Sequence, residues 1–183
     1  MGDDKITFEI FEKINDKLIV QVESIVQEKQ LTTDTEKKII ELNNNYKSFG
    51  NESIGIDAGA GTLGVSVFDH LLQEDDLKYK IVAINNAKRT YDKEGNNKAQ
   101  LLKTDLYDNM RAMMEHGTLK LLDDEEVIAS LQSVQYEYVI KEGSEPKLRI
   151  YGDNTHVVEG MIRAAWLANQ KSLNLMVYTI KTR

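Results

Sequence analysis

The sequence predicts one mixed α/β domain in which an antiparallel hairpin precedes parallel strands, with helices on both faces of the sheet. Apolar and polar residues alternate on both sides of Asn15-Asp16-Lys17, a pattern typical of a two-stranded hairpin. After the hairpin, short apolar strands alternate with amphipathic helices, and this order favours parallel strands joined by crossover helices. The 183 residues suffice for a single domain over 1–183 and are too few for two comfortable ones.

Each further element is predicted from its local pattern. Thr32, Thr33 or Asp34 can cap a helix, which we expect to end over Asn43 to Gly50. The next expected elements are a strand at 53–57, a helix at 64–73, a strand at 78–85, a helix at 101–116, a short helix opened by the acidic run 123–126, two strands around a turn at 143–146, a helix at about 155–170 and a last strand at 173–181. We interpret the acidic run as structural, because negative charge suits a helix N-terminus.

Composition excludes several classes of protein. The chain has no cysteine, which excludes disulfide scaffolds, thiol catalysis, iron–sulfur clusters and cysteine-ligated zinc, and three histidines are few for a histidine-rich metal site. The sequence carries neither a signal peptide pattern nor a long apolar run, so we expect a cytosolic (cytoplasmic) protein with no membrane segment. A net charge of -7 argues against holding DNA mainly by bulk phosphate neutralisation, although it allows local contact with DNA.

A glycine-rich turn follows the strand at 53–57. Residues 59–64, Gly-Ala-Gly-Thr-Leu-Gly, match the dinucleotide fingerprint GxGxxG and are similar to the glycine motif of enzymes that bind S-adenosylmethionine. The next strand ends in Asn85 and Asn86 without the acid that a dinucleotide site needs, and a plain connecting turn is a further interpretation. Asp57 ends the strand before the turn, where parallel α/β sheets place their sites.

A second acid lies in the helix at about 155–170. His156, Glu159 and Arg163 are spaced three and four residues apart and share one face of this helix. Apolar and small residues flank Glu159, so its carboxylate needs a partner or a cation. A Glu159–Arg163 ion pair with a surface histidine is the simpler interpretation. Together with Asp57, Glu159 forms an oxygen-ligand pair typical of Mg²⁺ or Mn²⁺ sites.

The order of these features resembles the C-terminal nuclease domain of the large terminase subunit of tailed phages and related viruses, which has an RNase H-like fold. The resemblance covers most of the chain, from the leading hairpin to about Ala168. Its motifs are Asp57 to Gly61 with the following Val67-Phe68-Asp69-His70-Leu71, then Asn97-Lys98 with the long helix that ends before Gly117, and His156-Val157-Val158-Glu159 ahead of Ala164-Ala165.

The resemblance implies a metal-dependent endonuclease that cuts concatemeric DNA during packaging, with two divalent ions about 3.5–4 Å apart. Asp57 and Glu159 are then catalytic metal ligands, His156 orients a water or a phosphate, and Asp153 is a lesser candidate ligand. The family's first catalytic aspartate lies on a strand before the hairpin, and that strand has no counterpart ahead of Asp3. We therefore expect weakened metal binding and low or no activity in this chain.

Partners are inferred from charge and from the resemblance. Residues 78–103 carry seven basic against two acidic residues, which favours a local path for double-stranded DNA, although a solvated loop is the alternative. The candidate DNA-binding residues are Lys88, Arg89, Lys93, Lys98 and Lys103. The resemblance also implies a terminase ATPase domain, a small terminase subunit and a portal as partners, and this sequence has no Gly-x-x-x-x-Gly-Lys-[Ser/Thr] motif of its own.

Two other classes remain open at this point. A nucleotide- or S-adenosylmethionine-binding enzyme would use the turn at 59–64 and would bind its cofactor independently of Glu159. A non-catalytic interaction module would bind neither metal nor cofactor.

Overall fold

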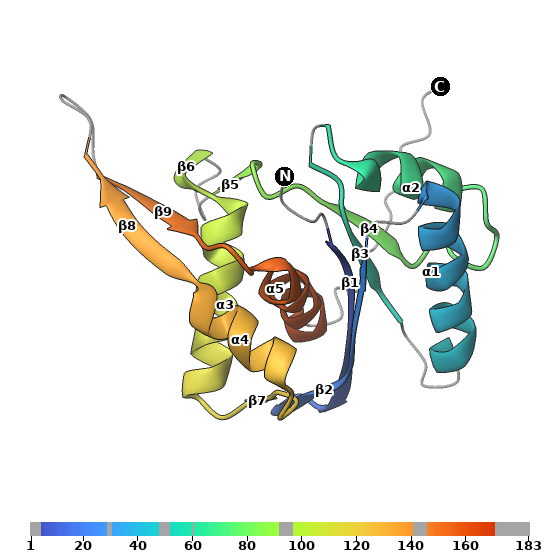
Figure 1. Ribbon diagram of the computed structural model, residues 1–183, viewed down its shortest axis with the longest axis horizontal. Helices are drawn as coiled ribbons and strands as arrows, with labels where there is room; N and C mark the ends of the chain where they lie inside the picture. Colours follow the sequence, from blue (N-terminus) through green and yellow to red (C-terminus); the bar gives the residue numbers. More distant parts are fainter. Residues whose placement is uncertain are drawn as a thin grey trace, which may run out of the picture.

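The computed structural model describes residues 5–28, 31–47, 52–59, 61–91, 97–140 and 146–170, with the backbone alone for 89–91 and 97–100 (Figure 1). The predicted last strand at 173–181 and most of the predicted turn at 143–146 lie outside these ranges. The fold is mixed α/β, with antiparallel and parallel strand pairs and five helices within the described part, as the sequence predicted.

The leading hairpin is confirmed. Strands β1 (Lys5–Asn15) and β2 (Leu18–Glu28) pair antiparallel, and the backbone N–H of Lys17 donates to the Asn15 side chain at 2.8 Å in the turn. The far edge of β2 pairs in parallel with the short strand β7 (Leu119–Lys120). These three strands form one sheet in the order β1-β2-β7.

A second sheet carries the glycine-rich turn. Strand β3 (Ile54–Asp57) pairs in parallel with β4 (Ile81–Ile84), and helix α2 (Leu63–Leu71) connects them as predicted. This strand–helix–strand unit places the carboxyl ends of β3 and β4 at the same edge of the sheet.

The helix before β3 ends within the predicted range and differs from its prediction at its start. Helix α1 spans Thr32–Tyr46, its N-cap is Leu31, and no side chain caps it. It continues past Asn43, which is buried and accepts a hydrogen bond from Lys80 Nζ at 3.0 Å. A distant lysine thus satisfies this polar side chain inside the helix, so it does not compete with the helix backbone.

The second half of the chain is mainly as predicted. Helices α3 (Leu102–Glu115) and α4 (Glu125–Ser133) precede a hairpin of β8 (Gln135–Val139) and β9 (Lys147–Tyr151), which leads into α5 (His156–Asn169). The side chain of Asp124 caps α4 by accepting from two backbone N–H groups, which confirms the structural interpretation of the acidic run. A further antiparallel pair, β5 (Arg89–Tyr91) and β6 (Asn97–Leu101), was not predicted.

Helices cover both faces of the sheets (Figure 1). Helices α3, α4 and α5 lie on one side, where Leu106, Met161 and Ile162 are fully buried. Helices α1 and α2 lie on the other side, where Val67 and Leu71 centre a second apolar cluster. Within the ranges described above, no helix combines the length and the apolar composition needed to cross a membrane.

Helix α5 packs unusually close to β1. A Cβ atom on Gly160 would lie 2.6 Å from Cγ of Glu9 and 3.0 Å from Oγ1 of Thr7, so only glycine allows this approach. The Thr7 hydroxyl also donates to the backbone carbonyl of His156 at 3.2 Å. The first turns of α5, which carry Glu159, are therefore fixed against β1.

This packing partly buries Glu9, and the burial raises the pKa of its carboxyl from 4.5 to about 8, against the lowering effect of hydrogen bonds from Ser24 and Gln21. Between those two pH values the folded chain keeps the proton that the unfolded chain loses, so stability should fall as pH rises from about 5 to 8, by up to about 1.4 kcal/mol per unit. Urea unfolding at several pH values measures this dependence. In Glu9→Gln the free energy of unfolding should decrease less between about pH 5 and 8 than in the parent chain.

The matched control is Glu12→Gln, on the same strand. It should leave the slope of stability against pH as in the parent chain. An unchanged slope in Glu9→Gln would contradict the assignment of the proton to Glu9.

Candidate active site at the ends of β3 and α5

Asp57 is the last residue of β3 and is held by the turn after it. Its Oδ1 accepts a long hydrogen bond from the Gly59 backbone N–H at 3.4 Å, and its backbone carbonyl lies 3.1 Å from the Thr62 hydroxyl. The Asp57 side chain remains 48% exposed. The carboxylate therefore stands at the carboxyl edge of the parallel pair, accessible from solvent.

The last glycine of the fingerprint has a packing role. A Cβ atom on Gly64 would lie 1.8 Å from the backbone carbonyl oxygen of Asp57, a distance that no side chain can accommodate. Gly64 thereby lets the first turn of α2 rest directly on the end of β3. This packing accounts for the glycine without a nucleotide.

Glu159, in the first turn of α5, has four polar partners. Tyr107 Oη donates to Oε1 at 2.9 Å and Lys103 Nζ lies 2.8 Å from the same oxygen. Asn86 Nδ2 donates to Oε2 at 3.1 Å, and Arg163 Nη2 lies 3.5 Å from it. Only 16% of the Glu159 side chain is exposed, so these partners offset the cost of burying its charge.

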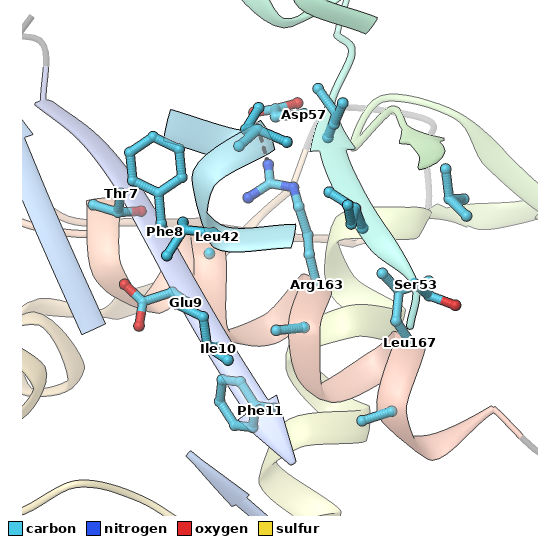
Figure 2. Close-up of a pocket in the computed structure, with 18 of the residues that line it drawn as sticks. Thr7, Phe8, Glu9, Ile10, Phe11, Leu42, Ser53, Asp57, Arg163 and Leu167 are labelled. Atoms are coloured by element: carbon cyan, nitrogen blue, oxygen red, sulfur yellow. Dashed lines mark hydrogen bonds and ion pairs between the residues drawn. The ribbon is translucent and has the colours of Figure 1, made fainter. Parts of the chain in front are cut away.

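Arg163 connects the two acids. Its Nη2 donates to Asp57 Oδ2 at 2.8 Å, its Nη1 donates to the backbone carbonyl of Glu159, and its side chain is 8% exposed. Figure 2 shows the guanidinium reaching from α5 to the Asp57 carboxylate at the end of β3. Asp57 and Glu159, which come from distant parts of the sequence, thus share one cation, and Glu159 also forms the ion pair with Arg163 that the sequence left open.

The donors at this site are oxygens. Besides the two carboxylates, Asn86 Oδ1 is buried and has no hydrogen-bond partner among the described residues, and neither has Arg163 Nε. Two carboxylates with an amide oxygen and waters form a ligand set that suits Mg²⁺ or Mn²⁺. In the part of the chain that the structure covers, no three His, Asp or Glu side chains are grouped closely enough to hold a metal ion.

The structure does not bring all the candidate ligands together. His156 opens α5 and lines the same cavity as Asp57 and Glu159, while its described hydrogen bond is made by its backbone carbonyl. Asp153 is exposed in the loop before α5, and no described contact joins it to Asp57 or Glu159.

The candidate DNA-binding residues lie in different settings. Lys103 forms the ion pair with Glu159 and faces the site, and Lys88 is exposed beyond the end of β4. Arg89 lies in β5 and Lys98 lies in β6, and the structure describes only the backbone of these two residues. Lys93 lies outside the described residues.

Tyr107 and Asn86 were not predicted as partners of Glu159. Lys103 and Tyr107 are four residues apart on one face of α3, and Asn86 follows β4, whose carboxyl end lies beside that of β3. The four-residue spacing on α3 and the position after β4 could have identified these residues in the sequence as neighbours of the site. Burial, reinforced by the charge of Glu159, raises the pKa of Tyr107 above its usual range, so its hydroxyl keeps its proton and donates.

Comparison with known proteins assigns the fold. No family model matches the sequence, and no curated protein matches it significantly. The mixed α/β fold is similar to the RNase H-like folds of large terminase nucleases, and two solved structures of such nuclease domains match it. One is the large terminase nuclease from thermophilic phage G20c with bound magnesium, with a TM-score of 0.59 and 12% identity over 90% of this chain and 75% of that chain. Another is the large terminase nuclease domain of Thermus phage P74-26, with a TM-score of 0.50 and 14% identity over 91% of this chain and 78% of that chain.

Removing the Arg163 guanidinium, which Asp57 and Glu159 share, should destabilise the folded chain. Arg163→Gln leaves Asp57 without its counter-ion and Glu159 with Lys103 alone, so we expect the free energy of unfolding to drop by about 2–3 kcal/mol, below the loss typical of a fully buried pair because Asp57 is half exposed. Urea denaturation in the absence of divalent ions measures the loss.

Arg149→Gln provides the control. Arg149 pairs with Glu137 at 3.0 Å in an exposed setting, and its loss should change stability by less than about 1 kcal/mol. Equal losses of stability in the two variants would show that the Asp57–Arg163–Glu159 arrangement stabilises the fold no more than an exposed ion pair does.

Proposed function

We propose that this chain is the nuclease domain of a viral DNA-packaging terminase and that it hydrolyses phosphodiester bonds of double-stranded, concatemeric DNA with Mg²⁺ or Mn²⁺ at Asp57 and Glu159. The observation that carries the proposal is the meeting of these two carboxylates on Arg163 at the carboxyl edge of β3. The fold it shares with large terminase nucleases, one of them with bound magnesium, supports the same conclusion.

Each residue has a distinct part in the proposed site. Asp57, half exposed, and Glu159 would hold the cation, with Asn86 Oδ1 as a neutral oxygen ligand. The bound ion would activate a water and stabilise the leaving oxygen of the phosphodiester. Tyr107 and Lys103 fix the orientation of the Glu159 carboxylate through Oε1, as outer-shell partners of metal ligands commonly do.

Arg163 has two roles in this proposal. Its guanidinium neutralises Asp57 and Glu159 when no divalent ion is bound, and it has to give up at least part of that contact when one binds. Because only two acids face this point among the described residues, we expect metal binding to be weak.

DNA would approach over the basic segment next to this edge. Lys88, which is exposed, and the basic residues Arg89, Lys93 and Lys98 would contact the phosphates, while Lys103 serves Glu159. His156 would orient a water or a phosphate from the cavity that it lines. A terminase ATPase domain, a small terminase subunit and a portal are the proposed partners.

Calorimetric titration with Mn²⁺ tests the shared site. Asp57→Asn and Glu159→Gln should each weaken Mn²⁺ binding by roughly tenfold or more, because each removes a charged ligand from the same ion. Cleavage of a supercoiled plasmid in the presence of Mn²⁺ should fall in the same two variants.

Glu115→Gln, an exposed position at the end of α3, is the control and should bind and cut like the parent chain. If both site variants bind Mn²⁺ like the parent, the shared site is wrong, and nucleotide and S-adenosylmethionine binding at residues 59–64 is tested next. Binding of none of these ligands would favour a non-catalytic interaction module.

A further inference from the structure

Two cations contact the Glu159 carboxylate within the described residues, and they differ in their access to solvent. The side chain of Arg163 is 8% exposed and also pairs with Asp57. The side chain of Lys103 is 30% exposed, and its Nζ lies 2.8 Å from Glu159 Oε1. A lysine ammonium is strongly hydrated and sits on a flexible stem. Lys103 is therefore the cation that can leave Glu159 for a partner in solvent.

Backbone hydrogen bonds place Lys103 beside the exposed lysine that follows β4. The N–H of Lys103 donates to the carbonyl of Asn86 at 3.2 Å, and the N–H of Leu102 donates to the carbonyl of Lys88 at 2.8 Å. The start of α3 and the loop after β4 are thus joined, although they are distant in sequence. A DNA backbone that contacts Lys88 would pass close to Lys103.

The orientation of the Glu159 carboxylate does not depend on Lys103 alone. Tyr107 Oη donates to Oε1, the oxygen that Lys103 contacts, at 2.9 Å, and Asn86 Nδ2 donates to Oε2 at 3.1 Å. Both of these donors are neutral, so they hold the carboxylate without opposing a cation that binds to it. What Lys103 adds is a positive charge, and a positive charge next to a ligand oxygen opposes the binding of a divalent ion.

We propose that Lys103 exchanges between the Glu159 carboxylate and a phosphate of the DNA backbone, so that DNA removes a competing cation and strengthens the binding of the divalent ion. The inference rests on the proposed function and names the regulation of the same site. Without DNA, Lys103 and Arg163 neutralise the two acids and keep the affinity for metal low. By linkage, the ion strengthens DNA binding by the same factor, so it is held best where a phosphodiester is present.

Calorimetric titration with Mn²⁺ in the absence of DNA tests the competition. Lys103→Met should bind Mn²⁺ roughly tenfold more tightly than the parent chain, because it removes a positive charge beside a ligand of the ion. Lys103→Arg keeps the charge and should bind Mn²⁺ like the parent. Unchanged binding in Lys103→Met would overturn the proposal, and weaker binding would show that Lys103 only orients Glu159.

Lys78→Met is the matched control for the lost charge. Lys78 pairs with Asp75 at 2.7 Å, and its side chain is 35% exposed, so its setting is close to that of Lys103. It precedes the amino end of β4, whereas the site lies beyond the carboxyl end. Lys78→Met should therefore bind Mn²⁺ like the parent chain.

Binding of a fluorescein-labelled DNA duplex in EDTA, measured by anisotropy, tests the exchange without metal. At about 0.1 M salt, Lys103→Met should weaken DNA binding by less than about twofold in the parent chain, where Glu159 holds the lysine, and by roughly fivefold in the Glu159→Gln background, where the lysine is free. Lys78→Met should have the same effect in both backgrounds. Equal effects of Lys103→Met in the two backgrounds would overturn the proposal, as would the absence of DNA binding in every variant.

The two proposals fail in different ways. If Glu159→Gln leaves Mn²⁺ binding unchanged, the proposed metal site is wrong, while the measurement in EDTA still shows whether Lys103 exchanges between Glu159 and DNA. If Glu159→Gln weakens Mn²⁺ binding but Lys103→Met and Lys78→Met bind the ion alike, the metal site stands and the role of Lys103 is wrong.

Discussion

The close contact of α5 with β1 at Gly160 is the constraint on which the rest of the structure depends. Helix α5 packs against β1, β2, β3, α3 and α4, and it is the element that joins the hairpin sheet to the sheet of β3 and β4. A larger residue at position 160 would push the helix outward along its first turns. The same turns carry Glu159 and Arg163, so the packing that assembles the domain also sets the distance between the two acids and their shared guanidinium.

The site is electrostatically balanced as the structure shows it. Asp57 and Glu159 face Arg163 and Lys103, so two negative charges meet two positive ones in a partly buried space. In this arrangement the two cations offset the repulsion between the carboxylates and the cost of desolvating them. It also means that any divalent ion entering the site competes with protein cations as well as with water.

Much of the fold could be predicted from local sequence pattern. Alternation predicted the hairpin, and the acids at 123–126 predicted the start of α4. The side-chain cap of α1 was wrong, because Thr32 is already the first residue of the helix and Leu31 is its N-cap. The hydrogen bond from Lys80 that satisfies Asn43 within the helix is a contact that local sequence cannot reveal. The pair β5–β6 was missed because its strands are short and rich in polar residues, without the period-two pattern that identifies a strand.

The candidate site was predictable only in part, for a related reason. Strand order places Asp57 at the carboxyl edge of β3, and the helix pattern places Glu159 and Arg163 on one face of α5. The reach of Arg163 to Asp57 and the pairing of Lys103 with Glu159 depend on how helices pack across the sheet. A basic residue near a site is therefore ambiguous in sequence, because the same lysine can face DNA or a neighbouring carboxylate.

The contact between Gly64 and the Asp57 carbonyl limits what a glycine motif can say about function. Letter for letter, residues 59–64 satisfy a widely used nucleotide-binding pattern, yet the last glycine is required by the joint between a strand and its helix. A search with this motif alone would classify proteins that have this strand–helix connection as dinucleotide-binding proteins. The distinguishing feature is the residue type just after the second strand, an amide at Asn86 in place of an acid, so the pattern is informative only when both positions are considered together.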